Sequence, residues 1–201
     1  MDNLWEPNSL AKNISLNKHN CVIIIHSEVP RNDTCMQKAA MQFIGYPEDI
    51  RKKLLAARCM NIAQSGQYNY PRVLSRGDNV AAALTEAEFI RNVISAVYLL
   101  NNRYMPFYKW MYHGVRILPI LGQPVGQLLQ QMTAYPAAET AEEDYFVHKI
   151  ELMQQICAVL ISELQRQGLS ASQDISLLEH GMQVHQRIAH EGLRASSPWM
   201  Q

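Results

Sequence analysis

Residues 139–167 read ETAEEDYFVHKIELMQQICAVLISELQRQ, and this stretch decides the fold class. Its apolar side chains recur every three or four residues, which is the period of an α-helix with one buried face. Gly168 follows directly, and glycine is the residue that most often ends a helix. The stretch therefore predicts the longest helix of the chain. Its buried face would consist of Ile150, Met153, Ile156, Cys157, Leu160, Ile161 and Leu164.

The same period extends over most of the chain. We expect further helices at about 47–64, from the capping residue Asp78 to about Leu100, from Pro106 to before Pro119, around 124–133, and from a cap at Ser172 or Asp174 to about Ile188. In the second of these, a core-facing stripe is predicted. It would consist of Val80, Leu84, Ala87, Ile90, Ile94 and Val97. In the last helix, the predicted stripe is Ile175, Leu178, Met182, His185 and Ile188.

Residues 1–45 follow no such period. Their one β-like run, Cys21–Ile25, lies between polar stretches and has no evident pairing partner. The sequence thus predicts an all-α fold, a helical bundle of about five to six helices, with a short irregular or β-containing N-terminal segment. We place the boundary between this segment, 1–45, and the helical domain, 46–201.

Length and composition exclude several classes of protein. A chain of 201 residues with 48% hydrophobic and 18% charged residues can bury a core, so disorder is not expected as its main state. Its 18 Lys and Arg balance 18 Asp and Glu, so the whole chain gives no specific signal for nucleic acid. Its longest apolar runs are too short to cross a membrane, and we expect a cytoplasmic protein.

Common catalytic and metal-binding motifs are missing from the sequence. The four cysteines form no CxxC pair, and no GxSxG, GxxxxGK[ST], GxGxxG or HExxH string occurs. His180, His185 and His190 are five residues apart, a spacing that spreads them around a helix. We therefore expect no metal site, no cofactor and no catalytic residue that sequence motifs can identify.

Cationic residues recur in the helix that starts at Pro106. Lys109, His113 and Arg116 are spaced by four and three residues and share one helix face. Trp110, Gly114 and Ile117 are expected on the other side, toward the core. If the loop with Arg72 and Arg76 lies against this basic stripe, the cations form a site for phosphate or carboxylate. Alternatively, the stripe is a solvated face or pairs with Glu86 and Glu88.

A polar cluster, Gln67, Tyr68 and Asn69, lies in a predicted connection between Gly66 and Pro71. Loops position functional side chains more often than cores do, so the cluster is a candidate for ligand binding. Its side chains could equally satisfy the backbone of a turn. Asp78 has the same two readings, a binding residue or the cap of the helix that follows.

Four short strings carry a resemblance to a known family. They are Gly66-Gln67-Tyr68-Asn69, Arg76-Gly77-Asp78, Leu99-Leu100-Asn101 and Tyr104-Met105-Pro106-Phe107-Tyr108-Lys109-Trp110. In order and spacing the chain resembles the helical family called domain of unknown function 4037, over roughly Tyr46 to Arg194. That family's domain usually follows a nucleotidyltransferase domain of the polymerase-beta type.

The resemblance implies a helical module that faces a catalytic partner. The catalytic domain itself needs a Gly-Ser turn and an Asp-x-Asp pair for magnesium, and this sequence contains neither motif. The segment 1–45 is then expected to be a vestige of that domain. By resemblance, the cleft that faces the partner would be lined by Gln67, Tyr68, Asn69, Arg72, Arg76, Asp78, Tyr104 and Lys109.

The sequence thus predicts a nucleotidyltransferase-associated helical domain, non-catalytic alone, that binds a nucleotide or other anionic ligand in a basic cleft. His113 and Arg116 complete the cationic side of that cleft. One alternative is a protein-interaction module, either the helical half of a split nucleotidyltransferase or a homo-oligomer. A second alternative is an enzyme with an acid/base site near Asp78 and Lys109, with Asp78 or Glu88 as the base.

Overall fold

The computed structural model describes residues 45–134 and 142–199. The β-like run Cys21–Ile25 lies outside the described residues, as do Cys21 and Cys35. Within the described residues the chain is helical, and the predicted all-α class is confirmed. None of these helices combines the length and the hydrophobicity that crossing a bilayer requires.

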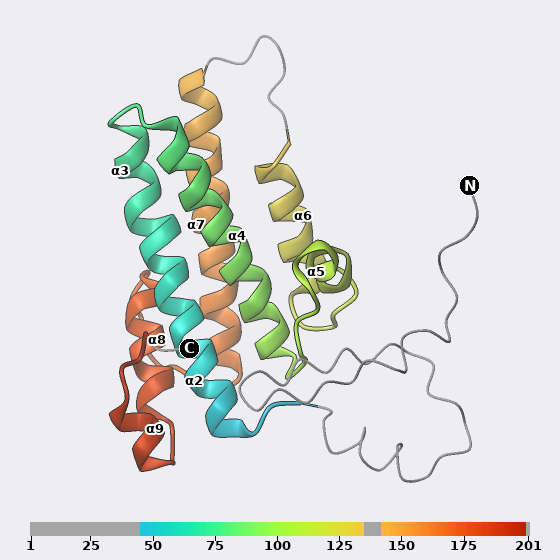
Figure 1. The fold of residues 1–201 in the computed structure, drawn as a ribbon, viewed down its shortest axis with the longest axis vertical. Helices are drawn as coiled ribbons and strands as arrows, with labels where there is room; N and C mark the ends of the chain where they lie inside the picture. The colour runs from blue at the N-terminus through green and yellow to red at the C-terminus, as the bar shows by residue number, and fades with distance from the viewer. Residues whose placement is uncertain (1–44, 135–141, 200–201) are drawn as a thin grey trace, which may run out of the picture. The chain divides into compact units, whose positions relative to one another are not determined.

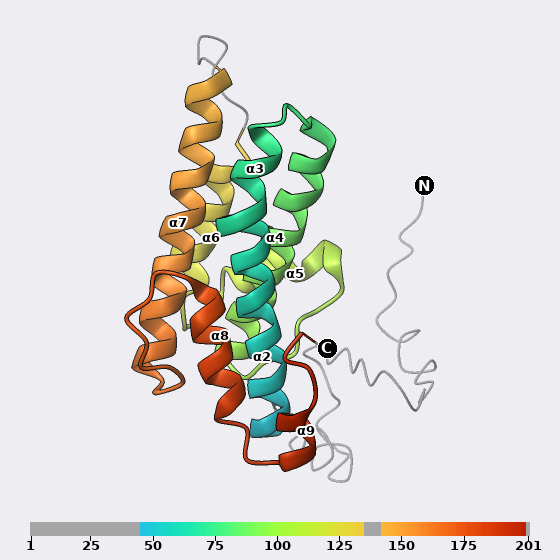
Figure 2. The ribbon, with the colours of Figure 1, turned by 90° about the vertical axis from the view of Figure 1, so that its left-hand side faces the viewer.

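Three long helical segments run side by side (Figures 1 and 2). The first joins α2 (Glu48–Ile62), the π-helix η2 (Ala63–Asn69) and α3 (Tyr70–Leu74) into one continuous segment. The second is α4 (Asn79–Leu100) and the third is α7 (Glu142–Arg166). Helix α8 (Leu177–Gln186) packs along α2, and α9 (Glu191–Ala195) follows it.

Two shorter helices cover the other side of α4. Helix α6 (Gly122–Met132) packs against α7, and α5 (Tyr108–Val115) contacts both α4 and α6. Figure 1 looks nearly along the axis of α5, so this helix lies across the upright α4. Helix α5 is shorter than predicted: it begins two residues after Pro106 and ends at Val115.

The polar stretch Gln64–Arg72, expected as a connection that could be helical in part, is helical throughout, because η2 and α3 continue the helix through it. Pro71 has no N–H to donate, so the α-helical hydrogen-bond ladder is interrupted there. Just before it, the N–H of Tyr70 donates to the carbonyl of Ser65, five residues back, as in a π-helix. Gly66 is buried here, and a Cβ on it would overlap the Phe89 ring of α4. The glycine thus permits close packing of two helices rather than a turn.

The predicted core face of α7 is confirmed. Met153, Ile156, Cys157, Leu160 and Leu164 are buried, while Ile150 and Ile161 pack against the core at its edge. Burial raises the pKa of the Cys157 thiol to about 12, and that of Cys59 as well, as expected of cysteines that serve as small apolar core residues.

The predicted stripe of α4 is wrong at its N-terminal end. Val80 and Leu84 are 72% and 69% exposed, whereas Ile94 and Val97 are buried as predicted. The core side of this helix instead runs through Ala82, Phe89, Val93 and Ala96, which have equally good helical spacing. Because both faces of α4 are apolar, its period alone could not indicate which face is covered.

The predicted stripe of the last helix is wrong in the same way, because Ile175, Leu178 and Met182 are exposed. His185 and Ile188 are buried as predicted. The face of α8 that meets α2 also carries Leu177, Gly181 and Val184. A Cβ on Gly181 would lie 2.9 Å from the carbonyl oxygen of Ala56, so this glycine sets how closely the two helices approach.

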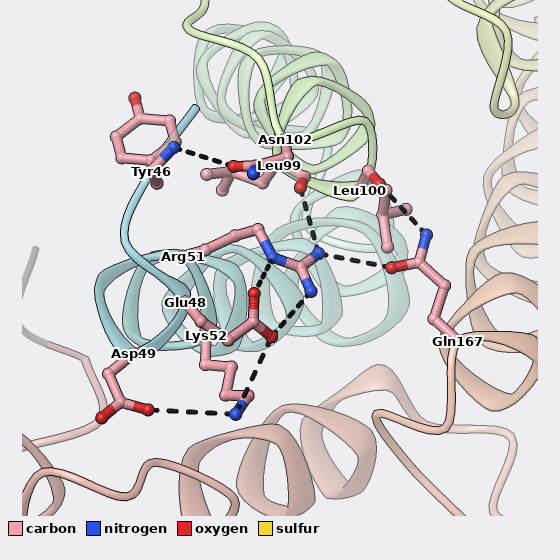
Figure 3. A network of polar contacts seen from close by, with 9 residues as sticks. All are labelled: Tyr46, Glu48, Asp49, Arg51, Lys52, Leu99, Leu100, Asn102 and Gln167. Atoms are coloured by element: carbon pink, nitrogen blue, oxygen red, sulfur yellow. Dashed lines mark hydrogen bonds and ion pairs between the residues drawn. The ribbon is translucent and has the colours of Figure 1, made fainter. Parts of the chain in front are cut away.

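A polar network joins the ends of three helices (Figure 3). The Arg51 guanidinium donates to the Leu99 carbonyl at the end of α4, to both Glu48 carboxylate oxygens, and to the Gln167 side chain. Gln167 in turn donates to the Leu100 carbonyl. Carbonyls at a helix C-terminus have no partner within the helix, so α2 and the end of α7 supply one for α4.

We expect Arg51→Ala to lower the free energy of unfolding by about 1–3 kcal/mol, because the Leu99 carbonyl is buried and loses a charged donor. Arg166→Ala is the matched control. It removes an arginine that also pairs with a glutamate three residues away, but whose own side chain is 64% exposed, so we expect a smaller loss of stability. Urea unfolding followed by circular dichroism measures both, and equal losses would contradict this account of the network.

Candidate functional site

The residues predicted to share one cleft lie in separate places. Gln67, Tyr68, Asn69 and Arg72 belong to η2 and α3, whereas Lys109 and His113 belong to α5. Figure 1 places α3 and α5 on either side of α4. Asp78 caps the start of α4 and Tyr104 follows its end, and a helix of 22 residues is about 33 Å long. The structure therefore does not bring these residues together around one ligand.

Several of them have contacts that account for their chemistry. The Gln67 amide accepts from the N–H of Leu177 and donates to the Ile175 carbonyl, which holds the start of α8. Asp78 accepts from the N–H of Ala81, which confirms it as the N-cap of α4. The Tyr104 hydroxyl donates to the Gly45 carbonyl, and its ring lies 4.3 Å from that of Tyr46.

The two predicted arginines of the other segment are both exposed. The Arg72 guanidinium stacks on the Tyr68 ring at 3.6 Å, a cation–π contact. Arg76 lies in the turn that precedes α4. Asn69 is half-buried in η2.

Lys109, His113 and Arg116 do share one side of α5, and all three are exposed. Most of the residues expected on the opposite, core-facing side of α5 are not buried. Trp110 and Ile117 were predicted to face the core, but they are 51% and 81% exposed. Only Gly114 faces inward as predicted, because a Cβ on it would overlap the Tyr98 hydroxyl. With Val115 buried instead, helix α5 packs one side against α4 and α6 and leaves the side that carries Trp110 and Ile117 exposed.

The acids considered as partners of this basic stripe are engaged elsewhere. Glu86 pairs with Lys149 of α7 at 2.8 Å, and Glu88 pairs with Arg91 on its own helix. In the described parts of the chain, Lys109, His113 and Arg116 form no ion pair. Their charges therefore remain available to an external anion.

Arg116 also lies at the edge of a pocket of about 290 Å³ between α4, α5 and α6. The other lining residues are Ile90, Ile94, Tyr108, Met111, Tyr112, Leu129, Gln130 and Thr133. Arg116 is the one charged side chain among these nine. Pockets between the helices of a bundle that combine apolar walls with a few polar groups are common ligand sites.

The pocket's polar edge is held in place by α6. The Tyr112 hydroxyl donates to the Gly126 carbonyl, and the Arg116 guanidinium lies 5.9 Å from the Tyr112 ring centroid. A Cβ on Gly126 would lie 3.0 Å from Cγ of Arg116, so the glycine leaves room for the arginine stem. The ring and the cation are thereby presented together at the mouth of the pocket.

Sequence reasoning missed a second polar cluster, between α2 and α4. The Arg58 guanidinium donates to the Ser95 hydroxyl and the Asn92 amide oxygen, and Asn92 donates to Glu88. Burial and the nearby Arg91 lower the pKa of Arg58, while Glu88 acts in the opposite direction. The signal was the spacing of Glu88, Asn92 and Ser95 by four and three residues, which is a polar stripe in an apolar helix. The cluster ties the two helices together.

A third cluster holds the C-terminal tail. The Lys53 ammonium donates to the carbonyls of Ser196 and Ser197 and to Nε2 of His185. Burial, and then the Lys53 charge, lowers the pKa of His185, although a backbone hydrogen bond with Ser196 opposes this. The neutral imidazole is therefore the form that the tail arrangement requires.

Among the described residues, no group of three His, Cys, Asp or Glu side chains is arranged to hold a metal ion. No curated protein and no solved structure matches the chain. Residues 14–111 match one family model, described as Domain of unknown function (DUF4037). Over this stretch, just under half of the chain, the sequence is similar to the DUF4037 family. The match begins inside the segment 1–45 and ends within α5, so it crosses the predicted boundary at residues 45 and 46.

The His185 arrangement predicts that the stability of this protein depends on pH. Because folding lowers the pKa of His185, the unfolded chain binds the extra proton more readily, and stability falls as the pH drops below about 6.5. Thermal unfolding at pH 7.5 and 5.5 measures the loss, and His185→Gln should reduce it. His148→Gln is the control, because that imidazole is 59% exposed. An unchanged pH dependence in His185→Gln would contradict the assignment.

Proposed function

We propose that this chain is a nucleotidyltransferase-associated helical domain, non-catalytic alone, that binds a nucleotide or other anionic ligand. The observation that supports a binding role is the pocket between α4, α5 and α6, with apolar walls and Arg116 at its edge. In this proposal residues 46–201 are the helical half of a nucleotidyltransferase.

The pocket suits the two parts of a nucleotide. Tyr108 and Tyr112 offer flat aromatic surfaces to a base, and Ile94 and Leu129 give that base an apolar environment. Arg116 can bind a phosphate with two parallel hydrogen bonds. Lys109 and His113 share the side of α5 that carries Arg116, so they add positive charge nearby. Arg72 and Arg76 are not part of this pocket, because α4 lies between α3 and α5.

The alternative of an enzyme with an acid/base site near Asp78 and Lys109 has less support. Asp78 caps α4 at one end of the helix, and Lys109 follows the other end. Glu88, the second candidate base, is bound by Arg91 and Asn92, and these hydrogen bonds outweigh burial and lower the pKa of its carboxyl group. A carboxylate with a lowered pKa is a weaker general base.

Calorimetric titration of the full chain with ATP, adenosine and pyrophosphate tests the proposal. We expect ATP to bind with a dissociation constant of about 1 mM or below, and adenosine to bind more weakly. Arg116→Gln should weaken ATP binding about tenfold by removing the phosphate contact. Arg72→Gln, a matched exposed arginine across α4, should have no effect. Failure of ATP to bind at millimolar concentration, or unchanged affinity in Arg116→Gln, would overturn the proposal.

A second candidate function is an interaction module, and the uncovered apolar side chains of α4 favour it. Val80 and Leu84 lie one turn apart and are both largely exposed, and exposed apolar patches are frequent at protein interfaces. The partner we consider is a second copy of this chain, which would cover α4 of both copies.

Light scattering after size-exclusion chromatography tests this candidate. A dimer of the 22.9 kDa chain is the expected species, and Leu84→Glu should return it to a monomer because it places a charge in the interface. Ile175→Glu is the matched control, since Ile175 is 83% exposed on another segment. A monomer at about 100 µM wild-type chain would rule the homodimer out.

A further inference from the structure

The outer face of α5 is an unusual surface for a protein of zero net charge. We define it as Lys109, Trp110, His113 and Ile117, with Phe107 at the start of the helix. Phe107 is 56% exposed, Trp110 51% and Ile117 81%. Large aromatic side chains are normally mostly buried, so two of them exposed within four residues of sequence call for an explanation.

The exposure follows from how α5 is anchored. Its inner side is fixed by Gly114, which fits against Tyr98, and by Val115, which is buried. The Tyr98 hydroxyl donates to the Met111 carbonyl and adds a second tie to α4. With that side held against α4, the outer face must point away from the bundle. No rotation of α5 can bury Trp110 without exposing Val115.

The stretch of sequence that carries this face has charges of one sign. Residues 89–134 contain four Arg and Lys residues and no Asp or Glu, although the whole chain has as many acids as bases. Arg103, Lys109 and Arg116 all come from this acid-free stretch. In the described part of the chain, none of these three forms an ion pair. A surface of uniform sign attracts polyanions over about a Debye length.

We propose that the outer face of α5 binds single-stranded nucleic acid. Trp110 and Phe107 supply rings on which successive bases stack, and Lys109 and His113 supply contacts to the phosphates between them. Lys109 Nζ lies 5.7 Å from the Trp110 ring centroid, so a base on the ring and a phosphate on the ammonium can belong to the same strand. Exposed aromatics interleaved with cations are the usual composition of such surfaces.

Two other occupants fit the face less well. Duplex DNA hides the faces of its bases, so it would use the cations but leave Trp110 and Phe107 without a partner. An acidic protein segment would likewise satisfy Lys109 and Arg116, but its carboxylates do not stack on Trp110 and Phe107, whereas every nucleotide carries both a phosphate and a base. The combination of rings and cations therefore favours an unpaired strand.

The inference goes beyond the proposed nucleotide pocket, and its stacking residues are different. The pocket is lined by Tyr108, Tyr112 and Arg116, whereas the strand would stack on Trp110 and Phe107. Lys109 and His113 serve both proposals. Trp110→Ala should consequently leave ATP affinity unchanged in the calorimetric titration. Loss of ATP binding in this variant would show that the two surfaces are one, and would overturn the proposal of a separate strand-binding face.

Fluorescence anisotropy with labelled 12-nucleotide strands of uridine and of deoxythymidine tests strand binding. We expect both strands to bind the full chain at 50 mM salt, at least tenfold more tightly than a 12-base-pair duplex. Trp110→Ala should weaken single-strand binding about tenfold through the loss of stacking. Trp199→Ala is the matched control, since that indole is 43% exposed in the C-terminal tail, and it should have no effect.

Salt dependence separates the phosphate contacts from the stacking. Lys109→Gln should reduce the slope of log affinity against log salt by about 0.7, the value for one phosphate contact on a single strand. Arg187→Gln, another exposed cation, should leave the slope unchanged. Absence of binding at 50 mM salt would overturn the proposal, as would an unchanged affinity in Trp110→Ala. Equally tight binding of a polyglutamate peptide would also overturn it in favour of an acidic protein partner.

Discussion

The fold depends on the burial of the second half of α4. All nine residues from Asn92 to Leu100 are buried, so this helix has no face along which its last turn can meet water. Its terminal carbonyls must be satisfied by protein groups, and Arg51 and Gln167 do so from two other helices (Figure 3). The cost of leaving these carbonyls unpaired fixes the ends of α2 and α7 relative to α4.

This central position of α4 also determines what the surface can do. A helix buried on all sides keeps its neighbours apart, so η2 and α3 lie on one side of it and α5 on the other (Figure 1). The two predicted groups of cations are on these separate sides. Residues that are close in sequence to either end of α4 therefore cannot converge on one ligand, however suitable their chemistry.

The sequence predicted the fold best where a helix has a single apolar face. Helix α7 is such a case, and its buried residues follow the predicted stripe. Helix α4 has two apolar faces. Its periodicity predicted Val80 and Leu84 in the core, but both are exposed in the structure. Helix α5 has only eight residues, so too few turns exist for a period to distinguish Trp110 from Val115. In both helices the choice is made by packing partners distant in sequence.

The candidate site could be predicted only in part for the same reason. The shared face of Lys109, His113 and Arg116 follows from local spacing, and it was predicted. The pocket beside Arg116 needs α6 to pack against α5, and two partners of Gln67, Ile175 and Leu177, lie more than 100 residues away. No local pattern carries such information. Arg58 was missed because its polar partners, Asn92 and Ser95, are on another helix.

Pairing of charges explains why a neutral chain presents a cationic surface. The acids of the described residues lie before α4's buried half or after α6, and several of them pair with bases. Glu48 binds Arg51, Glu86 binds Lys149, and Glu163 binds Arg166. Paired charges largely cancel at a distance, whereas Arg103, Lys109 and Arg116 form no ion pair among the described residues. Zero net charge therefore does not predict the electrostatic potential at this surface. That potential depends on which charges remain unpaired, and among the described residues Lys109 of α5 forms no ion pair.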